Sequence, residues 1–186
     1  GHASAVHGDL GGGPLELASF QSVCASALMA AKAAWLQVRA GEAETAAATG
    51  SEFSSRWFRP EFYERTPLID ARGRLRMEAD FLRFTLSDGA GAVVMEARPH
   101  ASQPSLRVEW IDMISMAGAF DPCMWAGATF ADRADTMRGW SQSGPVAAHA
   151  AGAIALLQDF DQLKIIIRSW VGVWLDQVDR GRIVPD

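Results

Sequence analysis

Cysteine is scarce in this chain of 186 residues, which contains only Cys24 and Cys123. The two form no CxxC pair, and this excludes a cysteine-rich zinc site. A single long-range disulfide would need an oxidising compartment. Free cysteine, by contrast, is among the most buried residue types. We therefore expect two free, buried thiols, with Cys24 in the core.

Positive charge and long apolar runs are also in short supply. Lys and Arg number 17 against 22 Asp and Glu, which gives a net charge of −5. Proteins that bind nucleic acid usually carry a basic face that displaces counterions, so no nucleic-acid partner is expected. The most apolar stretch, residues 163–175, is interrupted by Lys164 and Arg168. No membrane span is therefore predicted.

The common cofactor and hydrolase motifs are missing as well. There is no GxGxxG, no phosphate loop ending in Gly-Lys-Ser/Thr, and no GxSxG. His7-Gly8-Asp9 has the H-x-D form of an iron site, but a glycine-rich tail is a poor scaffold for metal ligands. His149 has no second histidine four residues away and no carboxylate within four residues. We expect no metal and no cofactor.

The N-terminal residues 1–13 are polar and end in three glycines, which predicts a flexible tail. Residues 14–186 are long enough for one domain with its own core. Ala3-Ser4-Ala5 has the small-x-small form of a signal-peptidase site, but no apolar segment precedes it. We expect a cytoplasmic protein, with a processed exported protein as the alternative.

Helical spacing dominates the first part of the predicted domain. Pro14 suits a first helical turn and Gly41 suits a helix end, so a helix is predicted between them. Its apolar stripe has three- and four-residue spacing and consists of Leu17, Phe20, Cys24, Leu28, Ala31, Trp35 and Val38. Residues 42–49 are interpreted as a helical turn or a loose connector. Prolines divide residues 51–66 into short helical pieces.

Alternating patterns then predict strands over residues 75–86, 93–97 and 106–110. Arginines on their wet face are expected to pair across strands with carboxylates; these are Arg74, Arg76, Arg98 and Arg107. Further helices are predicted over residues 129–138, 145–158 and 160–179, the last capped by Asp159 with Gln162. The predicted fold class is α+β, with an antiparallel sheet of three or more strands packed against N-terminal and C-terminal helices.

The last predicted helix is apolar around most of its circumference. A helix lying on a core usually shows a narrower apolar stripe. Three interpretations remain open: a central core helix, a helix that shares one flank with a partner, and a helix that lines a ligand cavity.

Tryptophan is plentiful, with seven residues in the chain. Trp170 and Trp174 are one helical turn apart, and Trp110 faces inward on its predicted strand with Trp125 shortly after. Indole rings are common in ligand sites and interfaces. The predicted ligand-binding set is Trp110, Trp125, Trp170, Trp174 and His149. The alternative is an aromatic core.

These observations lead to three functional hypotheses. The first is a non-catalytic binding or assembly module with a Trp/Met-lined groove, which takes an apolar small molecule or a partner protein and forms a homo-oligomer. The second is a cofactor-free enzyme with a polar centre around His149, Asp121 or Cys123. The third is a structural subunit of a larger complex. Of the two cysteines, Cys123 is the better candidate nucleophile, because it lies in a predicted loop whereas Cys24 lies on the apolar stripe of its helix, although the nearby Asp121 disfavours a thiolate.

Overall fold

The computed structural model describes residues 1–127 and 143–184. Contacts along the chain divide it into two compact units. Unit 1 contains residues 1–53 and 88–114, and unit 2 contains residues 54–87 and those from 115 onward. Each unit is described by itself, and the single domain over residues 14–186 stays a prediction.

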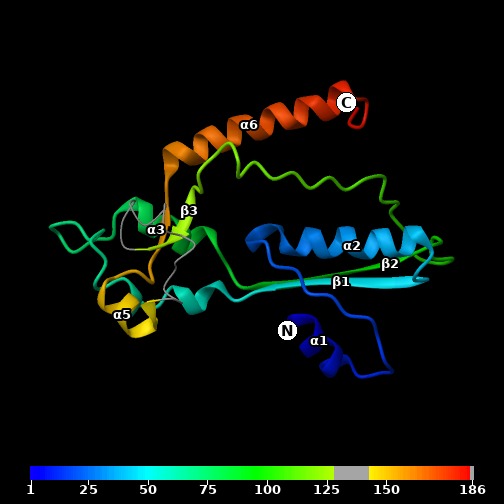
Figure 1. Cartoon of the computed structure of the whole chain (residues 1–186), viewed down its shortest axis with the longest axis horizontal. Coiled ribbons are helices and arrows are strands. Elements are labelled where there is room, and N and C mark those ends of the chain that lie inside the picture. Colours follow the sequence, from blue (N-terminus) through cyan, green and yellow to red (C-terminus); the bar gives the residue numbers. More distant parts are fainter. Residues whose placement is uncertain (128–142, 185–186) are drawn as a thin grey trace. The chain divides into compact units, whose positions relative to one another are not determined.

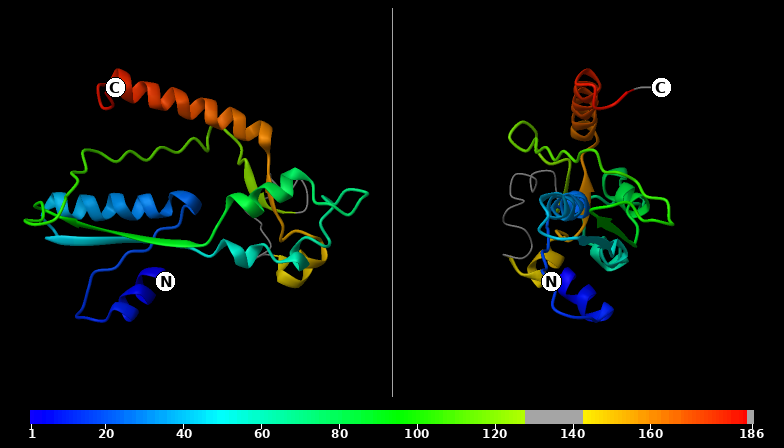
Figure 2. Two further views of the ribbon diagram at one scale, coloured as in Figure 1. Left: turned by 180° about the vertical axis from the view of Figure 1, so that it is seen from behind. Right: turned by 90° about the vertical axis from the view of Figure 1, so that its right-hand side faces the viewer.

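Unit 1 combines two helices with a two-stranded antiparallel sheet. The helices are α1 (His2–Leu10) and α2 (Ser26–Ala40), and the strands are β1 (Thr45–Glu52) and β2 (Gly89–Glu96). The strand register runs from Thr45 opposite Glu96 to Glu52 opposite Gly89. Helix α2 lies along this sheet and contacts mainly β1 (Figures 1 and 2). The N-terminal segment, expected as a tail, contains α1, none of whose residues is buried.

Helix α2 is alanine-rich, and alanine has the highest intrinsic helix propensity. It ends at Gly41, whose φ of 79° is the left-handed conformation that glycine adopts without a steric cost. The helix begins at Ser26 and not at Pro14 as predicted. The reason is Val23, which has a φ of 45° and so interrupts any continuous helix. Ala34 and Val38 on α2, and Ala48 on β1, are the buried apolar residues of this packing.

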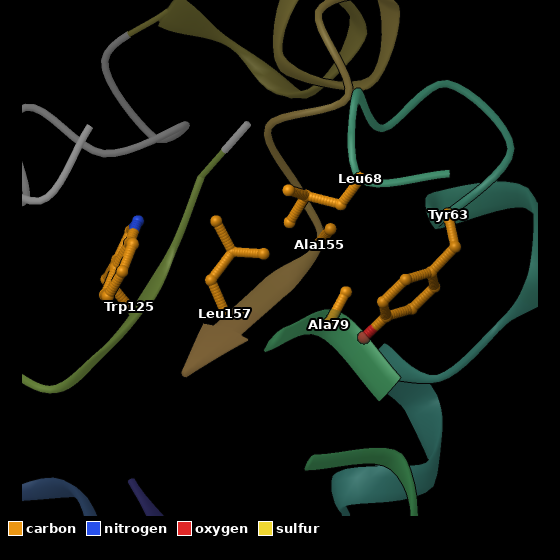
Figure 3. Close-up of a cluster of buried hydrophobic side chains, with 6 residues drawn as sticks. All are labelled: Tyr63, Leu68, Ala79, Trp125, Ala155 and Leu157. Carbon is orange, nitrogen blue, oxygen red and sulfur yellow. The ribbon is translucent and has the colours of Figure 1, made fainter. Parts of the chain in front are cut away.

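Unit 2 holds the larger group of buried side chains. Its main elements are α3 (Met77–Thr85), β3 (Met124–Ala126), α5 (Pro145–Ala150), β4 (Leu156–Gln158) and α6 (Phe160–Asp179), with short 3₁₀ turns η2 (Ser54–Trp57) and η3 (Pro60–Phe62). Strands β3 and β4 pair antiparallel. Leu157 of β4 is fully buried, with Trp125 on one side and Tyr63, Leu68 and Ala79 on the other (Figure 3).

The predicted sheet of three or more strands is wrong. The described residues contain two separate two-stranded sheets. Residues 77–85 form the helix α3, which buries Ala79 and Leu82 at helical spacing. The alternating charges that suggested a strand include Glu78 and Asp80, which lie in the first turn of α3, where the helix dipole favours acidic side chains.

Three further segments differ from their predictions. Residues 45–52 form the strand β1 in place of a helical turn or connector, because pairing with β2 outweighs the low strand propensity of alanine. Residues 106–110 form no strand. The strand predicted over residues 93–97 overlaps only the second half of β2, which begins at Gly89. The helix expected over residues 145–158 ends at Ala150, and its last part is the strand β4. The predicted helix over residues 129–138 lies outside the described residues.

The last helix is confirmed with the predicted bounds. Asp159 caps α6, and its carboxylate accepts hydrogen bonds from the backbone N–H groups of Asp161 and Gln162 at 3.0 and 2.9 Å. The side chain of Gln162 does not return to Asp159 but donates to the Asp121 carbonyl at 3.1 Å. Only Gln177 on α6 is buried, so the interpretation as a central core helix is wrong. In the described residues, no helix combines the length and apolarity that a membrane crossing needs.

Candidate active site

Cys24 lies in the short 3₁₀ turn η1 (Val23–Ala25), immediately before the first residue of α2. Its side chain is exposed and its thiol is free. The prediction of a buried core cysteine is therefore wrong for this residue. The N-terminal end of a helix carries unpaired N–H groups and a partial positive charge, and both favour negative charge nearby.

The backbone before Cys24 is held in an unusual conformation. Val23 has a φ of 45°, the only positive φ among the described residues other than glycine. A β-branched residue in this region is strained, at a cost on the order of 1–3 kcal/mol. Strain of this kind persists only where surrounding contacts hold it, and it is frequent at functional sites.

Ser26 supplies contacts that hold this turn. Its hydroxyl oxygen accepts a hydrogen bond from the Ser22 backbone N–H at 2.7 Å. The same hydroxyl donates to the Val23 carbonyl at 2.8 Å. One side chain in the first turn of α2 therefore holds both the strained residue and the residue before it. The result is a constrained turn that presents a thiol at the start of a 15-residue helix.

A second feature is an open hollow of about 720 Å³ in unit 2. Tyr63, Ile69 and Leu75 give it an apolar part. Its three arginines are each paired with a carboxylate: Arg74 with Asp70 at 3.1 Å, Arg76 with Glu78 at 2.6 Å, and Arg83 with Asp80 at 3.2 Å. Of the four arginines expected to pair across strands, Arg74, Arg76 and Arg107 pair instead with carboxylates near them in sequence, so the cross-strand prediction is wrong for these three. Each arginine that lines the hollow therefore already has a carboxylate partner.

Two of the titratable groups that line this hollow have shifted pKa values. Burial raises the pKa of Tyr63 above its ordinary value of 10.0, while the nearby Leu156 backbone and the charge of Arg83 act in the opposite direction. The Tyr63 hydroxyl makes no well-formed hydrogen bond with the described residues. The pKa of Asp70 is held low mainly by a hydrogen bond from the Arg74 backbone N–H, and further by the Arg72 N–H and the Arg74 guanidinium.

The residues predicted to bind a ligand are distributed over both units. Trp110 lies in unit 1 and is partly exposed, whereas Trp125 is buried in the core of unit 2. Trp170 and Trp174 lie on α6 with nearly half of their surface exposed. None of these residues lines the hollow of unit 2. Their role in binding stays a prediction.

The polar residues of the enzyme hypothesis have structural contacts. The Nε2 atom of His149 lies 3.0 Å from the Glu61 carbonyl, and its ring meets Phe62 edge-on. Cys123 is half-buried, and its carbonyl accepts from the Gln158 side chain at 2.7 Å. The Asp121 carbonyl accepts from Gln162. Over residues 1–127 and 143–184, no three His, Cys, Asp or Glu side chains are grouped closely enough to hold a metal ion.

Sequence reasoning placed Cys24 in the core, because its position fits the apolar stripe of a longer helix, and so missed that the helix begins after it. The signal was the pair of serines that flank it: Ser22 and Ser26 are typical of the residues that precede and cap a helix. A helix that starts after Cys24 would have placed the thiol at its N-terminal end, as the structure does.

Comparison with protein families gives one match. The model of the beta-ketoacyl synthase N-terminal domain matches residues 17–101, slightly less than half of the chain. The matched segment contains Cys24, α2, β1 and β2. No curated protein matches the chain. A family of condensing enzymes points to catalysis, so this match contradicts the predicted non-catalytic binding or assembly module.

Proposed function

We propose that this chain contributes the acyl-binding nucleophile of a condensing enzyme similar to beta-ketoacyl synthases, and that Cys24 is this nucleophile. The observation that carries the proposal is that the family match over residues 17–101 includes an exposed thiol at the start of a helix. The other cysteine, Cys123, lies outside the matched segment. The proposed reaction class belongs to fatty acid or polyketide synthesis.

The chemistry of condensation explains why a thiol is needed. Two acyl groups have to be joined, so one of them must be held on the enzyme while the carbon of the other attacks it. Cysteine does this by nucleophilic catalysis. The Cys24 sulfur attacks the carbonyl carbon of an acyl thioester, and a new sulfur–carbon bond forms. The bond to the donor sulfur breaks, and the donor leaves as a thiolate that takes up the proton lost by Cys24.

The local structure supports this role in two ways. The thiol is exposed, so that a thioester carbonyl can reach it. It also lies at the N-terminal end of α2, where the partial positive charge of the helix stabilises the negative charge that passes between the two sulfurs. The strained turn at Val23, fixed by Ser26, holds the sulfur in one place relative to the helix.

Partner and location form part of the same proposal. The acyl group of the donor is an apolar small molecule, which agrees in kind with the apolar ligand expected from the sequence. Beta-ketoacyl synthases commonly form homodimers, and this supports a homo-oligomer of the present chain. Beta-ketoacyl synthases are generally cytoplasmic, and on this ground we place the present protein in the cytoplasm.

The proposal is tested by acyl transfer from a simple acyl thioester, with intact-mass spectrometry as the readout. The full chain is compared with Cys24→Ala and Cys123→Ala. We expect one added acyl group on the wild type and on Cys123→Ala, released by hydroxylamine as a thioester should be, and none on Cys24→Ala. Transfer to Cys123, or equal labelling of all three proteins, would overturn the proposal. Circular dichroism checks that Cys24→Ala keeps its fold, which its exposed position favours.

A further inference from the structure

The face of α2 that meets β1 is built from small side chains at helical spacing. Ala27, Ala31, Ala34 and Val38 recur every three or four residues and lie on one side of the helix. Ala34 and Val38 are buried, as is Ala48 on the strand. Small residues on both elements allow a helix to approach a strand closely.

A close approach occurs near the N-terminal end of α2, which Cys24 precedes. A Cβ atom added to Gly50 of β1 would lie 2.7 Å from the Ala27 Cβ atom. Carbon atoms in good van der Waals contact are about 3.5–4.0 Å apart. The methyl group of alanine cannot rotate out of the way, so α2 or β1 would have to move. Gly50 is therefore the position that permits the start of α2 to lie against β1.

The cross-strand partner of Gly50 provides a contrast. Gly91 on β2 lies directly opposite Gly50 in the register of the sheet. A Cβ atom at Gly91 would meet nothing within 4 Å. The two glycines are paired in one sheet, but an added Cβ atom would meet α2 only at Gly50.

A displacement at Ala27 would reach the thiol within one turn. Ala27 follows Ser26, whose hydroxyl holds Ser22 and Val23 around the strained turn. Cys24 lies three residues before Ala27. If the first turn of α2 moves away from β1, the Ser26 hydroxyl moves with it, and the contacts that hold Val23 at its positive φ are weakened.

We propose that Gly50 is a positioning residue for Cys24: its missing side chain lets Ala27 rest on β1 and thereby fixes the turn that presents the thiol. This inference rests on the proposed role of Cys24 as nucleophile. Gly50 does not touch the acyl group and acts only through Ala27 and the first turn of α2.

The test measures the rate of alkylation of Cys24 by iodoacetamide across a range of pH, in Cys123→Ala as background. Four variants are compared in this background: Gly50→Ala, Ala27→Gly, both together, and Gly91→Ala as the matched control. We expect Gly50→Ala to slow alkylation of Cys24 by about threefold to fivefold at a fixed pH, the size of a lost helix-terminus effect. We expect Gly91→Ala to leave the rate unchanged.

The double variant separates positioning from a general loss of folding. It transfers the methyl group from the helix to the strand, so the space between them stays filled. We expect Ala27→Gly alone to alkylate close to the background rate, because it creates no clash with β1, and we expect the double variant to fold and to match it. Equal rates for Gly50→Ala and the background protein, or a folded double variant that stays slow, would overturn the inference.

The acyl-transfer experiment is run on the same proteins. If the background protein accepts no acyl group, the proposed function fails, whatever the alkylation rates show. If it does accept one, and Gly50→Ala is acylated at the same rate, only the role of Gly50 is refuted.

Discussion

Replacement of Gly152 by alanine should strongly destabilise unit 2. Gly152 follows α5 in a turn closed by its own N–H, which donates to the His149 carbonyl at 3.0 Å. It has a φ of 69°. An added Cβ atom would lie 2.5 Å from the carbonyl oxygen of Arg65 and 2.9 Å from the Cα atom of Thr66. Both are backbone atoms, so no side chain can rotate to make room.

The magnitude has two parts. A residue other than glycine in the left-handed region costs about 1–2 kcal/mol. Forcing an extra carbon into a packed position costs about 1–3 kcal/mol more. We therefore expect Gly152→Ala to lower the free energy of unfolding by about 2–5 kcal/mol, out of a total of roughly 5–15 kcal/mol for a protein domain.

Urea unfolding followed by tryptophan fluorescence measures this loss, because Trp125 lies in the core of the same unit. Gly144→Ala is the matched control: its φ of 83° carries the same conformational cost, but its Cβ atom would meet nothing within 4 Å. The control should lose only about 1–2 kcal/mol. If both variants lost the same free energy, the contact with residues 65 and 66 would contribute nothing, and the reasoning would be refuted.

Three further predictions concern unit 2. Tyr63 is the only tyrosine in the chain, so ultraviolet absorbance can follow its ionisation alone. Because burial raises its pKa, its contribution to stability is present below pH 10.0 and is lost as the pH rises beyond that value. A titration midpoint in the native protein equal to that of the unfolded chain would contradict this prediction. The pKa of Asp70 is lowered in the fold, so its contribution to stability is present above pH 3.8 and is lost as the pH falls below that value. Asp70→Asn should remove this part of the pH dependence of thermal unfolding. An unchanged pH profile in this variant would count against the prediction. Leu157→Ala should lower the free energy of unfolding, measured in urea, by about 2–5 kcal/mol. Leu106 is 97% exposed, so Leu106→Ala should lower it by less than about 0.5 kcal/mol. Similar losses for the two variants would exclude Leu157 from the core.

The parts of the fold that could be predicted are those with strong local signals. Helix α6 has a capping aspartate at its first end and sustained helical spacing over twenty residues. The strand β2 follows Asp88 and alternates over Val93 and Met95. In each case the neighbouring residues alone favour one conformation, so tertiary contacts had nothing to override.

The missed parts depend on partners far away in the sequence. The alanines of residues 46–48 favour a helix, but pairing with residues 93–95 places them in a strand. The alternation around Ala79 suits a strand as well as the first turns of a helix. Short patterns of this kind remain ambiguous until the packing against the rest of the chain decides between them.

The candidate site shows the same division. The sequence by itself determined that a cysteine between two serines precedes an alanine-rich segment with helical spacing, because these are local properties of residues 22–40. Only the tertiary structure decided that the helix begins after Cys24 and that the thiol is exposed. The physical reason is the contact between α2 and β1: it gathers Ala27, Gly50 and the buried alanines into one interface, and with the Ser26 hydrogen bonds it holds Val23 in a conformation that valine alone would avoid.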